Sequence, residues 1–387
     1  MYIQREEIFM KNKNIKIGLV TLFSVVALGT VAIQTGTTVD AADLGTPLQS
    51  RMYDPTPAPQ KLLNIWMTNG YALQPDATTN AEVGQKGVVL HTDVGRSVGS
   101  VVTGLLDAPH YRWLVSYDGK NWSSLPEWQY GHRENLPVDT SKEGTTWYQL
   151  DTQYYNYLTG WALKTHVYSN IAQVNVLPND VQPESVKVST DTNYIYNNKD
   201  QMMNSAYAHA VVTPTNATGK LTWSLDYEDQ KYATIDSTTG KITAKTNTDD
   251  YMKPARIKVI ATYTGSNTAK DSESNTVSGS SYVTIGGGLN DATVRSGQKA
   301  TFSLQGNQNN FNGSWNNNEI WVEWSKKSVG QKDSQSVSLG STRTMSMTTA
   351  PLTIHDSNQL YRAKVIMRNN GKETSMTTRW AKLIVNP

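Results

Sequence analysis

The sequence predicts an all-β protein built from several β-sandwiches in tandem, and three observations carry that prediction. Apolar and polar residues alternate in short runs such as ATFSLQ (300–305) and RIKVIATY (256–263), which is the period of a strand with one buried face. Turn-forming pairs such as DG, TG and NN separate these runs. Beyond the N-terminus, no long stretch has the 3.6-residue period of an amphipathic helix.

Length and composition allow several small, well-packed domains. The chain has 387 residues, of which 37% are hydrophobic, and its 11 Trp and 20 Tyr supply large apolar surfaces for small cores. The 35 basic and 33 acidic residues give a formal net charge of only +2. This balance argues against nucleic acid as a partner, because a polyanion-binding protein needs a strong positive field.

The first 41 residues are predicted to form a signal peptide. Lysines precede an uncharged apolar run at 17–33, and the small residues Val39 and Ala41 mark a cleavage site after Ala41. An uncleaved membrane anchor is the alternative, although the run is shorter than the roughly 20 residues that span a bilayer. We therefore expect a secreted or cell-surface protein that contacts a membrane only if this segment stays attached.

The chain contains no cysteine. Small exported domains often depend on disulfides, so the cores of this protein must be stable without them. A Lys-rich signal followed by Thr-, Asn- and Ser-rich modules without cysteine resembles exported proteins of Gram-positive bacteria.

Composition also predicts the domain boundaries. A Pro-rich segment, 42–62, is expected to be an extended linker after the signal peptide. The segments LPNDVQPES and IGGGLND then separate three modules of about 100 residues, the size of immunoglobulin-like sandwiches. The expected modules are 63–178, 183–285 and 289–387.

An internal repeat indicates that the first and third modules are the same kind of domain. Gly-Gln-Lys precedes a β-rich run in both, and the interval from Gly84 to Tyr148 equals that from Gly297 to Tyr361. Each interval contains a Trp strand.

The third module resembles an immunoglobulin-like domain that lacks its disulfide. Trp324 lies on the strand that carries the core indole in such domains, and Tyr361 takes the place of the corner tyrosine. Ala363 occupies the usual cysteine position, so apolar packing is expected to replace the bridge. In the first module, Trp113 and Tyr148 match more loosely and are also expected in the core.

The middle module has a more specific resemblance. The stretch VVTPTNATGKLTWSLDYEDQKYATIDSTTGKITAK (211–245) is similar to the bacterial immunoglobulin-like group 2 family. It has the family's Pro-x-Asn-Ala-Thr segment, its Trp-Ser strand at Trp223, its Ala-Thr-Ile-Asp strand and its Thr-Gly hairpin. The resemblance implies a core position for Trp223, display at the cell surface and contact with a ligand or partner, without naming that ligand.

Aromatic residues are more abundant in the first module than one sandwich core requires. We expect some of them to form an exposed platform for a sugar or a partner protein. The alternative is that they fill loops and module junctions. The predicted ligand-binding residues are Trp128, Tyr130, Tyr154, Tyr155, Tyr157 and Trp161.

The sequence contains only weak matches to motifs of catalytic or metal-binding sites. GRSVG (95–99) fits the nucleophile elbow of serine hydrolases, but the following sequence is not the helix that this elbow needs. SYDGKNW (116–122) is better explained as a hairpin that turns at Asp118-Gly119. The six histidines lack the spacing of a zinc site, and we expect neither a metal nor a cofactor.

The sequence therefore predicts a non-catalytic protein that acts in adhesion, in binding or as an envelope spacer. Its expected partner is an envelope polysaccharide, a host glycan or a surface protein. An array of carbohydrate-binding modules is the alternative function, and a serine hydrolase with Ser97 as nucleophile is the remote one.

Overall fold

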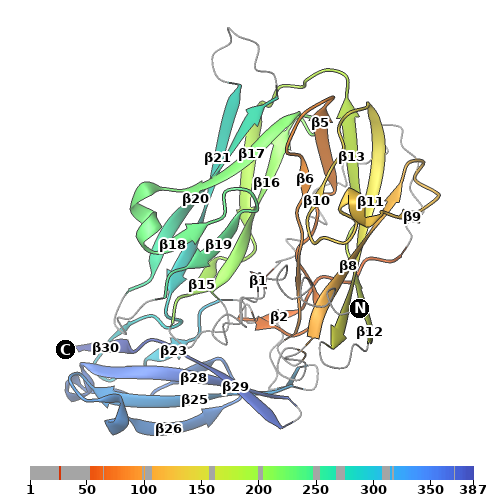
Figure 1. The fold of residues 1–387 in the computed structure, drawn as a ribbon. Helices are drawn as coiled ribbons and strands as arrows, with labels where there is room; N and C mark the ends of the chain where they lie inside the picture. Colours follow the sequence, from red (N-terminus) through yellow and green to blue (C-terminus); the bar gives the residue numbers. More distant parts are fainter. Residues whose placement is uncertain are drawn as a thin grey trace, which may run out of the picture.

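The computed structural model describes residues 26–27, 53–63, 65–97, 100, 107–156, 162–198, 204–246, 253–266, 275–306, 314–315, 318–369 and 371–387. Figure 1 shows three β-sandwiches: module 1 (residues 70–177), module 2 (185–286) and module 3 (292–386). Strands dominate the described residues, so the all-β prediction is confirmed. The 3-10 helices are short: η2 (Glu127–Gln129), η3 (Tyr227–Lys231), η4 (Asp333–Gln335) and η5 (Ile354–Asp356). Within the described part of the chain, no helix has the length and hydropathy required to cross a bilayer.

Module 2 has the strand order of an immunoglobulin-like sandwich. Its strands are β14 (Ser185–Thr190), β15 (Tyr194–Tyr196), β16 (Ser205–Thr213), β17 (Gly219–Leu225), β18 (Ala233–Ile235), β19 (Lys241–Ala244), β20 (Ala255–Gly265) and β21 (Thr276–Gly286). One sheet has the order β14-β16-β19-β18 and the other β15-β21-β20-β17. These are the ABED and CFG sheets of an immunoglobulin constant domain, with β15 added parallel to the last strand. The short strand β1 (Val26–Ala27) pairs with β16, and Trp223 is buried between the sheets.

Module 3 repeats this plan with a larger second sheet. Its strands are β22 (Ala292–Arg295), β23 (Thr301–Ser303), β24 (Ser314–Trp315), β25 (Asn318–Ser328), β26 (Val337–Thr342), β27 (Ser346–Thr348), β28 (Gln359–Asn369), β29 (Lys372–Thr377) and β30 (Ala381–Asn386). As in module 2, an early strand runs parallel to the last; here it is the first strand, β22, beside β30. Trp324 and Ala363 are cross-strand partners and both are buried. The ring of Phe302 stacks on Tyr361 at 4.4 Å, so apolar packing fills the centre of this sandwich.

Module 1 has one large sheet and two short strand pairs opposite it. Its strands are β4 (Gly70–Leu73), β5 (Thr78–Glu82), β6 (Val89–Leu90), β7 (Asp93–Gly95), β8 (Asp107–Ser116), β9 (Ser123–Ser124), β10 (Leu136–Pro137), β11 (Gly144–Asn156), β12 (Ala162–Tyr168) and β13 (Ala172–Leu177). The large sheet has the order β5-β13-β11-β8-β9, with β12 paired to β11. Here too an early strand, β5, runs parallel to the last strand, β13. Trp113, Tyr148 and Leu150 are buried in its core.

The hydrophobic core of module 3 extends to two tyrosines of module 2, whose other core residues form a separate cluster. Tyr194 and Tyr196 of module 2 belong to the same buried cluster as Phe302 and Trp324 of module 3. The hydroxyl of Tyr196 donates a hydrogen bond to the carbonyl oxygen of Gln305 across the boundary. The two sandwiches are therefore packed together as well as connected by the chain.

The segment before module 1 lies at the centre of the molecule. Strands β2 (Lys61–Leu62) and β3 (Ile65–Trp66) form a small hairpin, which Figure 1 places between the three sandwiches. Leu62 and Ile65 join the core of module 3. Of the expected linker 42–62, residues 42–52 lie outside the described part, and Tyr53 stacks on Tyr168 of module 1 at 4.3 Å. The last two residues of that expected linker form a buried strand.

Candidate binding face on module 1

Trp128 is the most exposed of the predicted ligand-binding residues. It lies on η2, between β9 and β10, and 78% of its surface is accessible. The loop that carries it is wrapped around the buried Trp113. The backbone of Trp113 donates to Gly131 O and accepts from Leu125 N, both at 2.8 Å, and its indole nitrogen donates to Arg133 O at 2.8 Å. Both ends of the loop are thus fixed to the core strand β8, while its Trp128 side chain remains in solvent.

Tyr130 ends η2 in a conformation that is unfavourable for a side chain. Its φ is 64°, in the left-handed region, and Arg133 lies 4.7 Å from its ring centre. The following residue, Gly131, has no room for a Cβ, which would lie 1.9 Å from Leu125 O. A strained backbone such as that of Tyr130 persists only where the surrounding structure fixes the conformation, and strain of this kind is common at binding sites.

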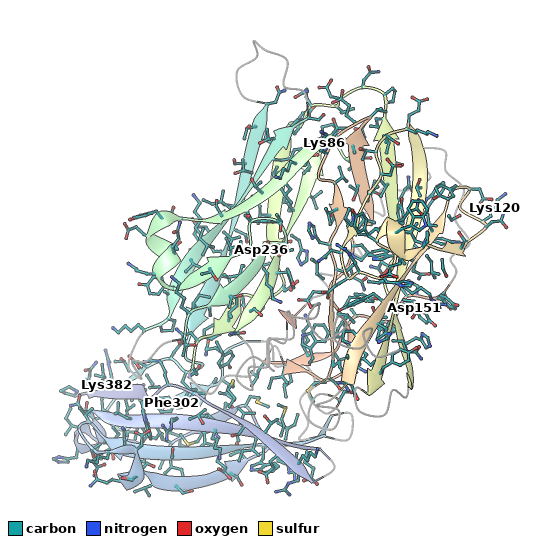
Figure 2. All side chains as sticks on the ribbon, in the orientation of Figure 1. Lys86, Lys120, Asp151, Asp236, Phe302 and Lys382 are labelled. Carbon is teal, nitrogen blue, oxygen red and sulfur yellow. The ribbon has the colours of Figure 1, made fainter. Side chains whose placement is uncertain are left out.

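Tyr117 is a second exposed aromatic residue of module 1, and it was not among the predicted ligand-binding residues. It is 68% exposed and directly follows β8, at the start of the β8–β9 hairpin. The predicted turn at Asp118-Gly119 is confirmed by this hairpin. The Asp118 carboxylate accepts hydrogen bonds from the amides of Lys120 at 2.8 Å and Asn121 at 2.7 Å, and these bonds hold its pKa below the usual value. Figure 2 shows Lys120 at the outer tip of module 1, on the side away from module 2. The position next to an Asp-Gly turn was the available sequence signal for exposure.

Tyr154 and Tyr155 lie on β11, outside the loop that carries Trp128. Tyr154 is buried, only 5% exposed, with Arg96 4.8 Å from its ring centre. Tyr155 is half-buried on the opposite face of β11, because adjacent strand residues point to opposite faces. Its ring packs on His110 at 4.2 Å. Tyr157 and Trp161 lie outside the described residues.

The outer face of the β8-β11-β12 sheet is occupied by contacts within the protein. Asp151 accepts hydrogen bonds from Arg112 at 2.6 Å and from His166 at 2.8 Å. Tyr168 is stacked between His166 and Tyr53. These rings cover one another's faces and hold the N-terminal segment on module 1, so the described aromatic residues of this face form no open platform.

Modules 1 and 2 are joined by specific polar contacts. Asp93 Oδ2 accepts from Tyr207 Oη at 2.6 Å and from Lys241 Nζ at 2.8 Å. Further along the boundary, the side-chain amide of Asn80 donates to Thr215 O at 2.7 Å. None of these pairs was predicted, because the partners are far apart in sequence.

Ser97, the candidate nucleophile, is engaged in a local turn. Ser97 Oγ donates to Ser100 Oγ at 2.9 Å and accepts from the amide of Ser100 at 3.1 Å, so its hydroxyl stabilises a local turn. Within the described ranges, no set of three or more His, Asp and Glu side chains is arranged to hold a metal ion.

Comparisons with known proteins add little beyond this geometry. No protein-family model matches the chain, and no curated protein is similar to it. One similar solved structure comprises the N-terminal four Ig domains of Dscam1 isoform 9.44, with 14% identity, 82% of this chain and 73% of that chain covered, and a TM-score of 0.24. Another is mouse Cadherin-23 EC22-24, with 12% identity, 82% and 99% coverage, and a TM-score of 0.22. The immunoglobulin-like fold is therefore assigned from the strand order of the chain itself.

Proposed function

We propose that this chain is an exported, non-catalytic binding protein of the cell surface, with module 1 as its ligand-binding part. Modules 2 and 3 support module 1 as one packed unit. The predicted signal peptide and the resemblance of module 2 to the bacterial group 2 family support an extracellular location in a Gram-positive bacterium. For the mature protein we propose three modules, at 63–178, 183–285 and 289–387.

The exposure of Trp128 on a fixed loop is the observation that carries this proposal. An exposed indole contributes little to folding, and the loop also contains the strained Tyr130. A rigid aromatic side chain loses little entropy when it binds, and this favours affinity. Both features are explained if the loop has been shaped for contact with a ligand.

Binding can be tested with the mature chain, residues 42–387. Its tryptophan emission is followed against cell-wall polysaccharides, mucin glycans and matrix proteins, for the unchanged chain and for Trp128→Ala. We expect a saturable change with one class and at least a tenfold weaker affinity in the variant, which corresponds to about 1.4 kcal/mol. Tyr227→Ala is the matched control, since Tyr227 is equally exposed, at 81%, but belongs to module 2. Equal affinity in Trp128→Ala and the unchanged chain would contradict the proposal.

Carbohydrate binding is the second candidate, and the position of Tyr117 favours it. Tyr117 directly follows β8, and the Trp128 loop is hydrogen-bonded to Trp113 of the same strand. Two exposed rings on one part of a module suit the apolar faces of successive sugar units. Glycan affinity that falls in both Tyr117→Ala and Trp128→Ala would support this function, whereas protein-only binding would exclude it.

The serine hydrolase alternative has the least support. The Ser97 hydroxyl is engaged with Ser100 in a turn. Ester hydrolysis by the mature chain that disappears in Ser97→Ala would overturn the non-catalytic proposal.

A further inference from the structure

Strand β16 of module 2 has a buried edge that its neighbour β14 does not cover. Pairing between the two strands extends only as far as Thr190 opposite Ala208. Asp191 then covers Tyr207: its amide donates to Tyr207 O at 3.0 Å, and its carboxylate accepts from the amide of Tyr207 at 3.0 Å. The chain next crosses to the other sheet, where β15 pairs with β21. The part of β16 that contains Ser205 is thus left by β14, although Ser205 is fully buried.

The backbone groups of Ser205 point to this edge. The opposite edge of β16 pairs with β19, and there the amide of Ala208 donates to Gly240 O at 3.0 Å. Because backbone groups alternate in direction along a strand, Ser205 points the same way as Tyr207 and away from β19. Buried amide and carbonyl groups are almost always hydrogen-bonded. The edge at Ser205 therefore requires an occupant.

The occupant in this structure is β1. It pairs with β16 in parallel, with Val26 opposite Ser205 and Ala27 opposite Ala206. It also lies against β3 of the central hairpin and β4 of module 1 (Figure 1). The same three neighbouring strands supply one apolar cluster, which consists of Trp66, Ala72, Leu73 and Tyr207. A free backbone edge between apolar walls is suited to an extended, uncharged apolar segment.

Two buried polar atoms on the surrounding strands also favour a main-chain ligand. Ser205 Oγ of β16 and Trp66 Nε1 of β3 have no hydrogen-bond partner among the described residues. Burying a polar group without a partner is costly, so such groups usually mark a place where a ligand or water completes the structure. The carbonyl and amide groups of a bound strand are partners that both atoms can use.

We propose that this edge of β16 is a strand-binding site, which the chain's own N-terminal apolar segment fills before cleavage and which cleavage opens. Residues 26–27 belong to the apolar run 17–33 of the predicted signal peptide, so the inference rests on the proposed removal of residues 1–41. Docking on β16 and insertion into a bilayer exclude each other, because one backbone segment cannot lie in both places. The docked segment joins modules 1 and 2 in the unprocessed chain, and processing leaves the edge at Ser205 free.

Amide hydrogen exchange of the mature chain, residues 42–387, tests the site directly. The probe is a synthetic peptide of residues 22–31, with added lysines for solubility. We expect a saturating concentration of peptide to slow exchange of the Ser205 amide at least tenfold. The Ala206 amide is the internal control, because it points to β19 and should exchange slowly with or without peptide. Ala27→Pro in the peptide removes the amide of a pairing residue and should abolish the effect.

Three results would overturn the proposal. They are slow exchange at Ser205 in the mature chain without peptide, no change when peptide is added, and an equal change with the Ala27→Pro peptide. If the peptide aggregates, the uncleaved chain 1–387 is compared with its Ala27→Pro variant, and the Ser205 amide should be protected only in the unchanged chain. The site lies on module 2, so a negative result here does not alter the Trp128 experiment on module 1, and the two proposals can fail separately.

Discussion

The amide nitrogen of Gly288 donates a hydrogen bond to the hydroxyl oxygen of Tyr194 at 2.9 Å. This bond attaches the segment 285–291, which connects modules 2 and 3, to module 2. The same segment packs against module 3, where the Arg379 guanidinium donates to Leu289 O at 2.7 Å. A glycine-rich sequence that composition marks as a linker is therefore packed against both modules.

Gly288→Ala should uncouple modules 2 and 3. Gly288 has φ 89°, and a Cβ there would lie 2.3 Å from the Tyr196 ring. The backbone conformation alone costs an alanine about 1–2 kcal/mol, and overpacking adds about 1–3 kcal/mol. Denaturant unfolding would measure the loss. Gly297→Ala is a matched control with the same φ and no atom within 4 Å of the added Cβ. Equal losses in the two variants would show that the linker is not tightly packed.

Trp113→Ala should destabilise module 1 strongly, whereas Trp128→Ala should leave its stability almost unchanged. Loss of the buried Trp113 should cost module 1 about 3–5 kcal/mol, because a large cavity remains. Loss of the exposed Trp128 should change stability by less than about 0.5 kcal/mol. Thermal unfolding by calorimetry separates the two, and a strongly destabilised Trp128→Ala would mean that its ring packs in the fold and is not presented to a ligand.

Lys61→Met should stabilise the protein near neutral pH. Burial lowers the pKa of Lys61 from 10.5 to about 7, and its ammonium nitrogen has no hydrogen-bond partner among the described residues. The unfolded chain therefore binds more protons between pH 7 and 10.5, so stability should rise with pH in that window. Methionine removes the penalty, and we expect a gain of about 2–5 kcal/mol at pH 7. Urea unfolding at pH 7 and 9.5 tests this. Lys142→Met, on an exposed residue, should leave the pH dependence unchanged.

Tyr71→Phe should weaken module 1 without opening a large cavity. The buried Tyr71 hydroxyl lies 3.0 Å from Leu150 O, 2.9 Å from Thr152 Oγ1 and 3.0 Å from Val167 O. Phenylalanine leaves these buried groups without that partner, at a cost of about 1–3 kcal/mol. Urea unfolding should detect this loss, whereas Tyr227→Phe on an exposed residue should show none. An unchanged midpoint for Tyr71→Phe would mean that water replaces the hydroxyl.

Local sequence pattern was sufficient to predict which side chains of a single strand are buried. The alternation in 300–305 predicted that Ala300, Phe302 and Leu304 share a face, and all three are buried while Thr301 is exposed. The same rule, applied to Tyr154 and Tyr155, would have separated them, since neighbours on a strand point apart. The predicted platform grouped them by composition instead of by period.

Contacts between modules could not be predicted from the sequence. Asp93 and Lys241 lie in different sandwiches, and no periodicity connects them. Likewise, Leu62 and Ile65 pair with each other in the β2–β3 hairpin, but their side chains are buried among residues such as Leu383 and Val385 of the last strand. Local sequence pattern cannot predict contacts between residues so far apart in the chain.

The central hairpin has a consequence for the order of folding. Leu62 and Ile65 are packed in the same cluster as Leu383 and Val385 of the last strand. In a chain synthesised from its N-terminus, these apolar side chains lack part of their covering surface until the last strand has been made. The packing around the hairpin is therefore completed last. A chain truncated before β30 should bind chaperones or be degraded, because its hairpin still lacks the surface that covers it.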